Sequence, residues 1–220
     1  MKSQNLSNKP VKITIPGPLT ISDTIANDYY ASNKDMAHDL AEAINQEIKK
    51  LSFAGCKYIQ VDEPLFARKP KEALEFGIEN LEKCFHGCDE NTEKIVHICC
   101  GYPNKLNSIN YPKAPLKSYF DISKTLDQSM IDCVSLEDAH RNNDLKLLEN
   151  FKKTKIILGL VKIAESSIEE ISLIDARIKS ALKHIDKDRF IAAPDCGLGL
   201  LSKSLAKIKL KNLVAAAKLN

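Results

Sequence analysis

KIVHICC (residues 94–100) is a short, almost uninterrupted apolar segment that includes a histidine and ends in two cysteines. Five further segments of this kind occur along the chain: VKITIPG (11–17), CKYIQVD (56–62), DCVSLE (132–137), KIILGLV (155–161) and RFIAAPD (189–195). Segments that are rich in Val and Ile and apolar throughout are typical of parallel strands covered on both faces. The sequence therefore predicts six parallel strands.

Helical patterns lie between these predicted strands. Residues 33–55 carry apolar side chains on one helical face, and Gly55 is a suitable helix stop. The other predicted helices cover roughly residues 70–86, 114–129, 143–152, 167–185 and 199–218. The repeated strand–helix order predicts an α/β protein.

The number of strand–helix units predicts the architecture more closely. A closed (β/α)8 barrel needs eight units, and we count about six in a single domain, residues 1–220. We therefore expect a TIM-type barrel that lacks its first strands. Such a barrel leaves two sheet edges and apolar surface open. A fragment of a longer product, a barrel completed by a partner or a second copy, and a degenerate protein are the three alternatives.

Composition excludes several classes of function. The net charge of +3 is spread along the chain without a basic block interleaved with aromatic residues, so we expect no nucleic-acid partner. No apolar stretch reaches the ~18–20 residues of a membrane span. The polar start, MKSQNLSNKP, has no apolar signal core, and seven cysteines form no regular disulfide framework. We expect a cytoplasmic protein with reduced thiols, among which Cys56 and Cys133 fill the core.

Polar residues end five of the predicted strands. They are Pro16-Gly17-Pro18, Asp62-Glu63-Pro64, His97-x-Cys99, Glu137-Asp138 and Asp195-Cys196. In a parallel barrel all strand carboxyl ends lie at one face, and that face carries the active site. We therefore expect these residues to converge in space.

Four of these residues form a candidate zinc set: His97, Cys99, Glu137 and Cys196. His97 and Cys99 are two apart on a strand, so their side chains share a face, whereas Cys100 points to the other face. Two thiolates, an imidazole and a carboxylate suit tetrahedral zinc, and zinc would activate a substrate thiol. The alternative is a core histidine beside a buried thiol. The cluster CFHGC (84–88) follows a helix and is interpreted as a surface loop.

Other strand-end residues suit substrate binding. Asp62 and Glu63 could hold a substrate ammonium group by a charge-assisted hydrogen bond, or could be solvated loop carboxylates. Gly17 allows the backbone to approach a ligand closely. His140, three residues after Glu137, is a candidate general acid or base, with an ordinary surface histidine as the alternative.

At these residues the chain resembles the C-terminal catalytic barrel of cobalamin-independent methionine synthase. The matching stretches are IPGPLT, EAINQEIKKLSFAGCKYIQVDEP, HICCG, VSLEDAHRNNDLKLLENF and PDCGLGLLSKSLAKIKLKNLVAAA. The chain is most similar to the short, single-barrel relatives of that enzyme, whose fold is a TIM-type barrel like that of uroporphyrinogen decarboxylase. The resemblance implies that His97, Cys99, Glu137 and Cys196 bind zinc and that Asp62 holds the amino group of homocysteine. It also implies methyl transfer from a methylated tetrahydrofolate to the zinc-bound homocysteine sulfur, which gives methionine.

The chain departs from that family in two places. The family's proton-donating histidine aligns with Ala164 in GLVKIAESSIEE, so His140 is a candidate replacement. The strands that precede IPGPLT in the family are absent from this sequence. The sequence therefore predicts a zinc-dependent methyltransferase acting on homocysteine. The alternatives are methyl transfer from a corrinoid protein or another donor to a thiol, and a non-catalytic zinc-binding partial barrel.

Overall fold

A single parallel sheet organises the protein. The computed structural model describes residues 4–108 and 111–220. Six strands are hydrogen-bonded in the order β1-β2-β3-β4-β5-β6, and every neighbouring pair is parallel. Their bounds are β1 (Lys12–Pro16), β2 (Tyr58–Asp62), β3 (Glu93–Ile98), β4 (Cys133–Leu136), β5 (Lys155–Val161) and β6 (Phe190–Pro194). The predicted α/β class and all six predicted strands are confirmed.

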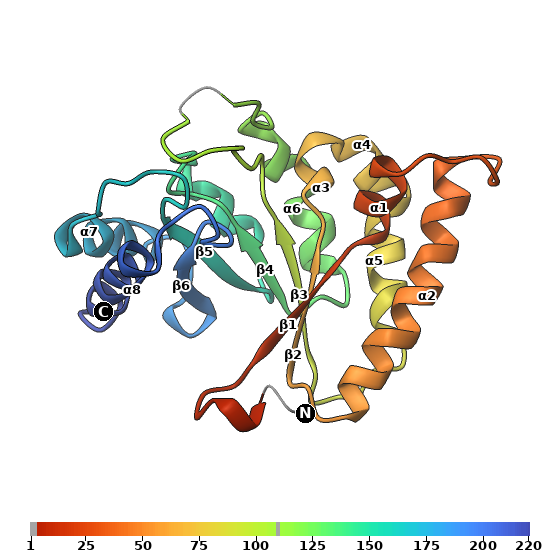
Figure 1. Ribbon diagram of the computed structural model, residues 1–220, viewed down its shortest axis with the longest axis horizontal. Coiled ribbons are helices and arrows are strands. Elements are labelled where there is room, and N and C mark those ends of the chain that lie inside the picture. Colours follow the sequence, from red (N-terminus) through yellow and green to blue (C-terminus); the bar gives the residue numbers. More distant parts are fainter. Residues whose placement is uncertain (1–3, 109–110) are drawn as a thin grey trace.

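Helices connect successive strands, except that a 3-10 turn connects β4 to β5, and the helices cover one face of the sheet. They are α1 (Pro18–Thr24), α2 (Asn33–Phe53), α3 (Leu65–Arg68), α4 (Pro70–Glu72), α5 (Ile78–Phe85), α6 (Lys117–Gln128), α7 (Ile171–Ala181) and α8 (Lys203–Ala217). A π-helical turn, η2 (Ala73–Gly77), joins α4 to α5, and short 3-10 turns are η1 (Gln4–Leu6), η3 (Leu145–Asn150) and η4 (Lys187–Arg189). Figure 1 shows the strands fanned out between a group that contains α2 and α5 and a second group that contains α7 and α8.

Local sequence signals explain the helix ends. The Ser32 hydroxyl accepts a hydrogen bond from the Asp35 N–H at the start of α2. At its end, Gly55 has φ +86°, and the N–H groups of Gly55 and Cys56 donate to the carbonyls of Ser52 and Leu51. This is the Schellman arrangement that glycine favours, so the predicted stop is confirmed. By contrast, the predicted helix over 143–152 is only the 3-10 turn η3.

Two apolar layers lie on the two sides of the sheet. The main core packs the outward residues of the strands, such as Val61, Val96 and Val134, against the helices. A smaller cluster of Ile95, Cys133 and Ile157 lies on the inner side. Cys56 and Cys133 are 1% and 0% exposed, as expected for core residues.

The two edge strands differ from the inner four. Among the described residues, β1 and β6 each pair with one neighbour, so the sheet has two open edges. Lys12, Thr14 and Pro16 of β1 are exposed, whereas all of β4 is buried. Closure of this curved sheet by further strands stays a prediction. Within the part of the chain that the structure describes, no helix combines the length and apolar character needed to cross a membrane.

Candidate metal and substrate site

A cavity of about 410 Å³ opens at the inner side of the sheet, toward the carboxyl ends of the strands. Its lining comes from β1 and β2 through Lys12, Gln60 and Asp62, and from β3 and β4 through His97 and Ser135. The segment 193–197, which contains Cys196, closes the other side. Residues that are up to 185 positions apart in sequence, from Lys12 to Gly197, therefore share one cavity.

Three of the predicted zinc ligands lie together. One ligand atom from each of His97, Cys99 and Cys196 lies within 4.8 Å of the other two, and His97 and Cys99 are 6% and 8% exposed. The Nδ1 atom of His97 is 2.9 Å from the Ser135 hydroxyl, whereas its Nε2 atom is buried without a hydrogen-bond partner. A buried polar atom that no protein group satisfies is costly unless a ligand completes it. The donor set and the unpartnered Nε2 therefore fit a zinc ion.

The electrostatics of this cluster favour a thiolate. The Cys99 thiol beside Cys196, together with His97, lowers the pKa of Cys196 to about 4. The pKa of Cys99 is raised, first by its contact with Cys196 and then by burial. Burial alone would lower the pKa of His97, but Cys196, together with the charges of Asp62 and Glu137, outweighs burial and raises that pKa. Cys196 is therefore the thiol that is prepared to bind a metal ion as an anion.

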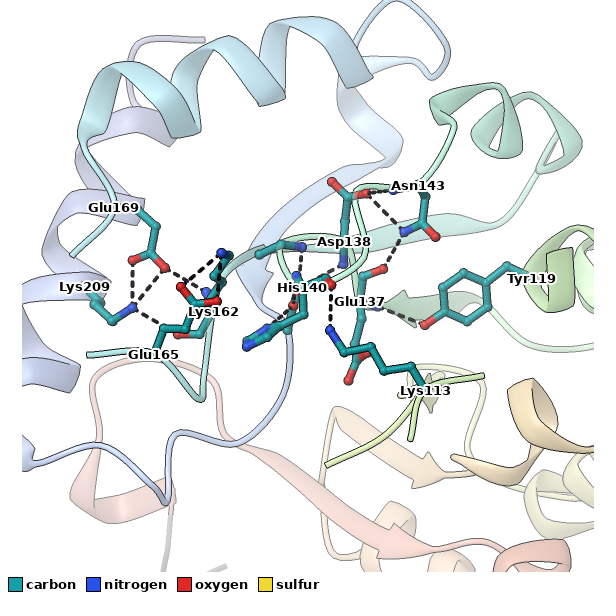
Figure 2. A network of polar contacts seen from close by, with 12 residues as sticks. Lys113, Tyr119, Glu137, Asp138, His140, Asn143, Lys162, Glu165, Glu169 and Lys209 are labelled. Carbon is teal, nitrogen blue, oxygen red and sulfur yellow. Dashed lines mark hydrogen bonds and ion pairs between the residues drawn. The ribbon is translucent and has the colours of Figure 1, made fainter. Parts of the chain in front are cut away.

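Glu137, the fourth predicted ligand, lies at the end of β4 but outside the 4.8 Å group. Its N–H donates to the Tyr119 hydroxyl (3.1 Å), which itself donates to the Ile98 carbonyl (2.6 Å), so Tyr119 ties the ends of β3 and β4 together. Figure 2 shows the backbone of Glu137 held by Tyr119 and Asn143 while the carboxylate projects away from them. Burial raises the pKa of Glu137 to about 7, and its Oε2 atom has no hydrogen-bond partner. Oε2 of Glu137 is therefore a second buried ligand atom without a partner, after Nε2 of His97, and it lies near the cluster.

Asp195 organises the loop that carries His140. Its carboxylate accepts hydrogen bonds from the backbone N–H groups of Asp138, Ala139 and His140 at 2.7–2.9 Å. It also accepts one from Nδ1 of His140 at 2.8 Å. The other ring nitrogen, Nε2, is buried and has no partner. His140 is therefore not an ordinary surface histidine but a fixed ring with one nitrogen left for another group (Figure 2).

Asp62 and Glu63 are adjacent in sequence but face different environments. Asp62 lines the cavity, and Gln60 donates to its Oδ1 atom at 2.6 Å. Glu63 is 0% exposed, and its carboxylate accepts hydrogen bonds from the N–H groups of Leu19 and Thr20 and from the Thr20 hydroxyl. Glu63 thus holds the first turn of α1 rather than lining the cavity, and burial raises its pKa to about 7.

The absence of a side chain at Gly17 makes room for the carboxyl group of Glu63 and not for a ligand. A Cβ atom at Gly17 would lie 2.2 Å from the Glu63 carboxyl group, so the expected close approach of the backbone exists but is made to a side chain of the protein.

Asp195 is the functional residue whose role the sequence did not indicate. It follows the strand β6 and neighbours Cys196, but its four hydrogen bonds to the 138–140 loop depend on strand order.

Two remaining sequence features fall outside the site. The interpretation of 84–88 as a surface loop is wrong for Cys84 and Phe85, which are buried in the last turn of α5, and the segment contributes no ligand to the metal group found among the described residues. Ala164 is 1% exposed and offers no proton donor. Its neighbours Lys162 and Glu165 form an ion pair at 2.8 Å.

Ser135 is expected to orient the metal ligand His97. Replacing Ser135 by alanine removes the partner of Nδ1, so the ring loses its fixed tautomer and rotation. Loss of such a partner typically weakens metal affinity about 10–100-fold. Competition with a chromophoric chelator measures this change, and Ser123→Ala, which removes a hydroxyl from α6, is the control. Equal zinc affinity in Ser135→Ala and the unmodified protein would contradict the role.

A parallel sheet in sequential strand order, with a His–Cys–Cys cluster at its carboxyl end, defines a parallel α/β protein with a candidate metal centre. The sequence model of the family described as "Cobalamin-independent synthase, Catalytic domain" matches residues 1–219. The chain therefore belongs to the cobalamin-independent methionine synthase family, which confirms the resemblance.

Individual relatives agree with this assignment. Methionine synthase of Sulfolobus acidocaldarius is 33% identical over 206 residues, which are 93% of this chain and 55% of that protein. Methionine synthase of Sulfurisphaera tokodaii is 34% identical over 95% of this chain and 56% of its own length. The structure of a B12-independent methionine synthase from Shewanella sp. W3-18-1 in complex with selenomethionine has a TM-score of 0.88 at 31% identity, covering 98% of this chain and 63% of that one. This chain thus spans little more than half the length of the two methionine synthases.

Proposed function

We propose that this chain is the zinc-binding part of a methyltransferase that moves a methyl group to the thiol of homocysteine to give methionine. The observation that carries the proposal is that Asp62 lines the same cavity as His97 and Cys196, two members of the His–Cys–Cys cluster. A thiol-binding centre and a carboxylate for an ammonium group are the two contacts that an amino-acid thiol requires. The relatives are named methionine synthase, which supports homocysteine as the substrate.

In this proposal His97, Cys99 and Cys196 hold zinc, and Glu137 is the fourth ligand. The fit rests on the buried, unpartnered atoms Nε2 of His97 and Oε2 of Glu137. When bound, zinc lowers the pKa of a substrate thiol and presents it as the thiolate near neutral pH.

The other residues of the chain bind and position. Asp62 accepts the hydrogen bonds of the substrate ammonium group, which fixes one end of the molecule. The thiol end is then oriented toward the methyl donor, and this positioning supplies much of the rate enhancement. Asp195 holds His140 by a hydrogen bond from Nδ1, which carries a proton. The Nε2 atom is then free to give a proton to the leaving group of the methyl donor. Methylated tetrahydrofolate, or its polyglutamate, is the proposed donor.

Asp62→Asn is expected to weaken homocysteine binding selectively. A hydrogen bond to a charged group contributes about 1.5–3 kcal/mol, so the loss is about 10–100-fold in Kd. The affinity for 4-mercaptobutanoate, which has the thiol but no amino group, is expected to stay the same. Calorimetric titration of the zinc-loaded protein measures both values. Asp132→Asn, which lies at the opposite ends of the strands beside Lys94, is the matched control. An unchanged homocysteine Kd would remove Asp62 from the binding site.

The methyl donor is tested by offering two donors side by side. Zinc-loaded protein is incubated with homocysteine and either 5-methyltetrahydrofolate (as mono- and triglutamate) or a methylated corrinoid protein, and methionine is measured by mass spectrometry. Methionine from the folate supports the proposal. The resemblance aligns the family's proton-donating histidine with Ala164, so methionine from the corrinoid protein alone would assign the alternative donor. No methionine from either, with zinc bound, would indicate a non-catalytic zinc-binding barrel.

A further inference from the structure

Three polar side chains form a hydrogen-bonded row along the inner face of β1 and β2. Nζ of Lys12 donates to Oε1 of Gln60, and Nε2 of Gln60 donates to Oδ1 of Asp62 at 2.6 Å. Gln60 and Asp62 are two residues apart on β2, so they share a face, and Lys12 pairs in register with Tyr58 one row below. All three residues line the cavity that His97 and Cys196 of the His–Cys–Cys cluster also line.

The donors and acceptors of these three side chains allow only one direction of hydrogen bonding, from Lys12 through Gln60 to Asp62. An ammonium group can only donate hydrogen bonds, whereas an amide has one accepting end and one donating end. Lys12 therefore holds the amide of Gln60 with its oxygen toward β1 and its NH₂ toward Asp62. In the flipped orientation the amide oxygen would face the Asp62 carboxylate and two donors would face each other.

Asp62 needs this support because of where it lies. Burial raises its pKa, and the hydrogen bond from Gln60, followed by the charges of His97 and Lys12, opposes that rise. Lys12 is the one Lys or Arg among the cavity-lining residues that the structure describes. The row therefore supplies a hydrogen bond that fixes the carboxylate and a positive charge that favours its ionised form.

We propose that Lys12 and Gln60 are positioning residues that orient Asp62 to receive the ammonium group of an α-amino thiol. This inference rests on the proposed function, because it assigns Asp62 the substrate ammonium group. It adds two residues to the recognition of the amino group, and it predicts that neither acts on the thiol or on the metal ion.

The test measures two ligands on variants of the zinc-loaded full chain. Gln60→Met keeps the length of the side chain, and Lys12→Met shortens it by one atom; both remove the hydrogen bonds. Each is expected to weaken homocysteine binding roughly tenfold, as loss of one hydrogen bond to a charged group does. Zinc content and the Kd of 4-mercaptobutanoate are expected to stay unchanged. Lys12→Arg retains a donor and should restore most of the homocysteine affinity, and Lys9→Met, which removes an exposed charge before β1, is the control.

The outcomes separate this inference from the proposed function. Unchanged homocysteine affinity in both Met variants, with a weakened Asp62→Asn, would overturn the positioning role alone. Equal weakening of both ligands would also overturn it, because the row would then support the cavity in general. If unmodified zinc-loaded protein binds neither thiol, the proposed function fails and this inference fails with it. Where Gln60→Met does not fold, the comparison of Lys12→Met with Lys12→Arg decides the question.

Discussion

Replacing Cys196 by alanine is expected to abolish stoichiometric zinc binding and to reduce homocysteine methylation by at least about 10³-fold. Cys196 is the thiol whose pKa is lowered to about 4, so its loss removes the prepared anion of the cluster. A catalytic metal contributes several kcal/mol to the transition state, and each ~1.4 kcal/mol is tenfold in rate. Cys99→Ala is expected to act in the same direction. Zinc is measured by atomic emission after dialysis, and methionine by mass spectrometry.

Another cysteine of the same chain provides the matched control. Cys88 is partly buried after α5, away from the cavity, so Cys88→Ala is expected to retain zinc and rate. Full zinc occupancy in Cys196→Ala and Cys99→Ala together would contradict the proposed metal centre. Loss of zinc without loss of methyl transfer would contradict the role of the metal in the reaction.

The sequence could predict the strands because burial on both faces leaves a continuous apolar signal. It could also predict that strand ends converge, since all neighbours in a parallel sheet end at one edge. His97, Asp62 and Cys196 lie at one cavity for this reason. The prediction of a helix over 143–152 was wrong. A short 3-10 turn buries Leu145, Leu147 and Leu148, and the spacing of these three residues does not follow the 3.6-residue period of an α-helix.

The position of Glu63 on the helix-covered face could also have been predicted from the sequence. Successive strand residues point to opposite faces, and this rule separates Cys99 from Cys100. The same alternation, applied one residue past Asp62, places Glu63 on the helix-covered face with Gly17 and α1, where the structure has it. The hydrogen bonds of Asp195 could not be predicted in this way, because they join a loop after β4 to the end of β6.

Gly159→Ala is expected to destabilise the protein and to weaken the metal centre at once. Gly159 lies on β5 where its register with β6 shifts, and an added Cβ would lie 2.0 Å from Oδ1 and 2.6 Å from Cα of Asp195. The Cα atom cannot move aside as a flexible side chain does, so the strand end that carries Cys196 must shift. Overpacking of this kind costs about 1–3 kcal/mol, and displacement of Cys196 should lower zinc affinity as well.

Gly197, which follows Cys196, provides the control. It tests whether any added methyl group near Cys196 destabilises the protein, or only one that meets Asp195. Gly197 has open space around the position of a Cβ, so Gly197→Ala is expected to change the free energy of unfolding by no more than about 0.5 kcal/mol and to retain zinc. Urea denaturation followed by circular dichroism measures stability, and a chelator competition measures zinc affinity. Equal unfolding midpoints for the two variants would show that β5 and Asp195 can separate without cost. The close packing of Gly159 against Asp195 would then have no part in placing Cys196, and the position of that ligand would depend on the hydrogen bonds of Asp195 alone.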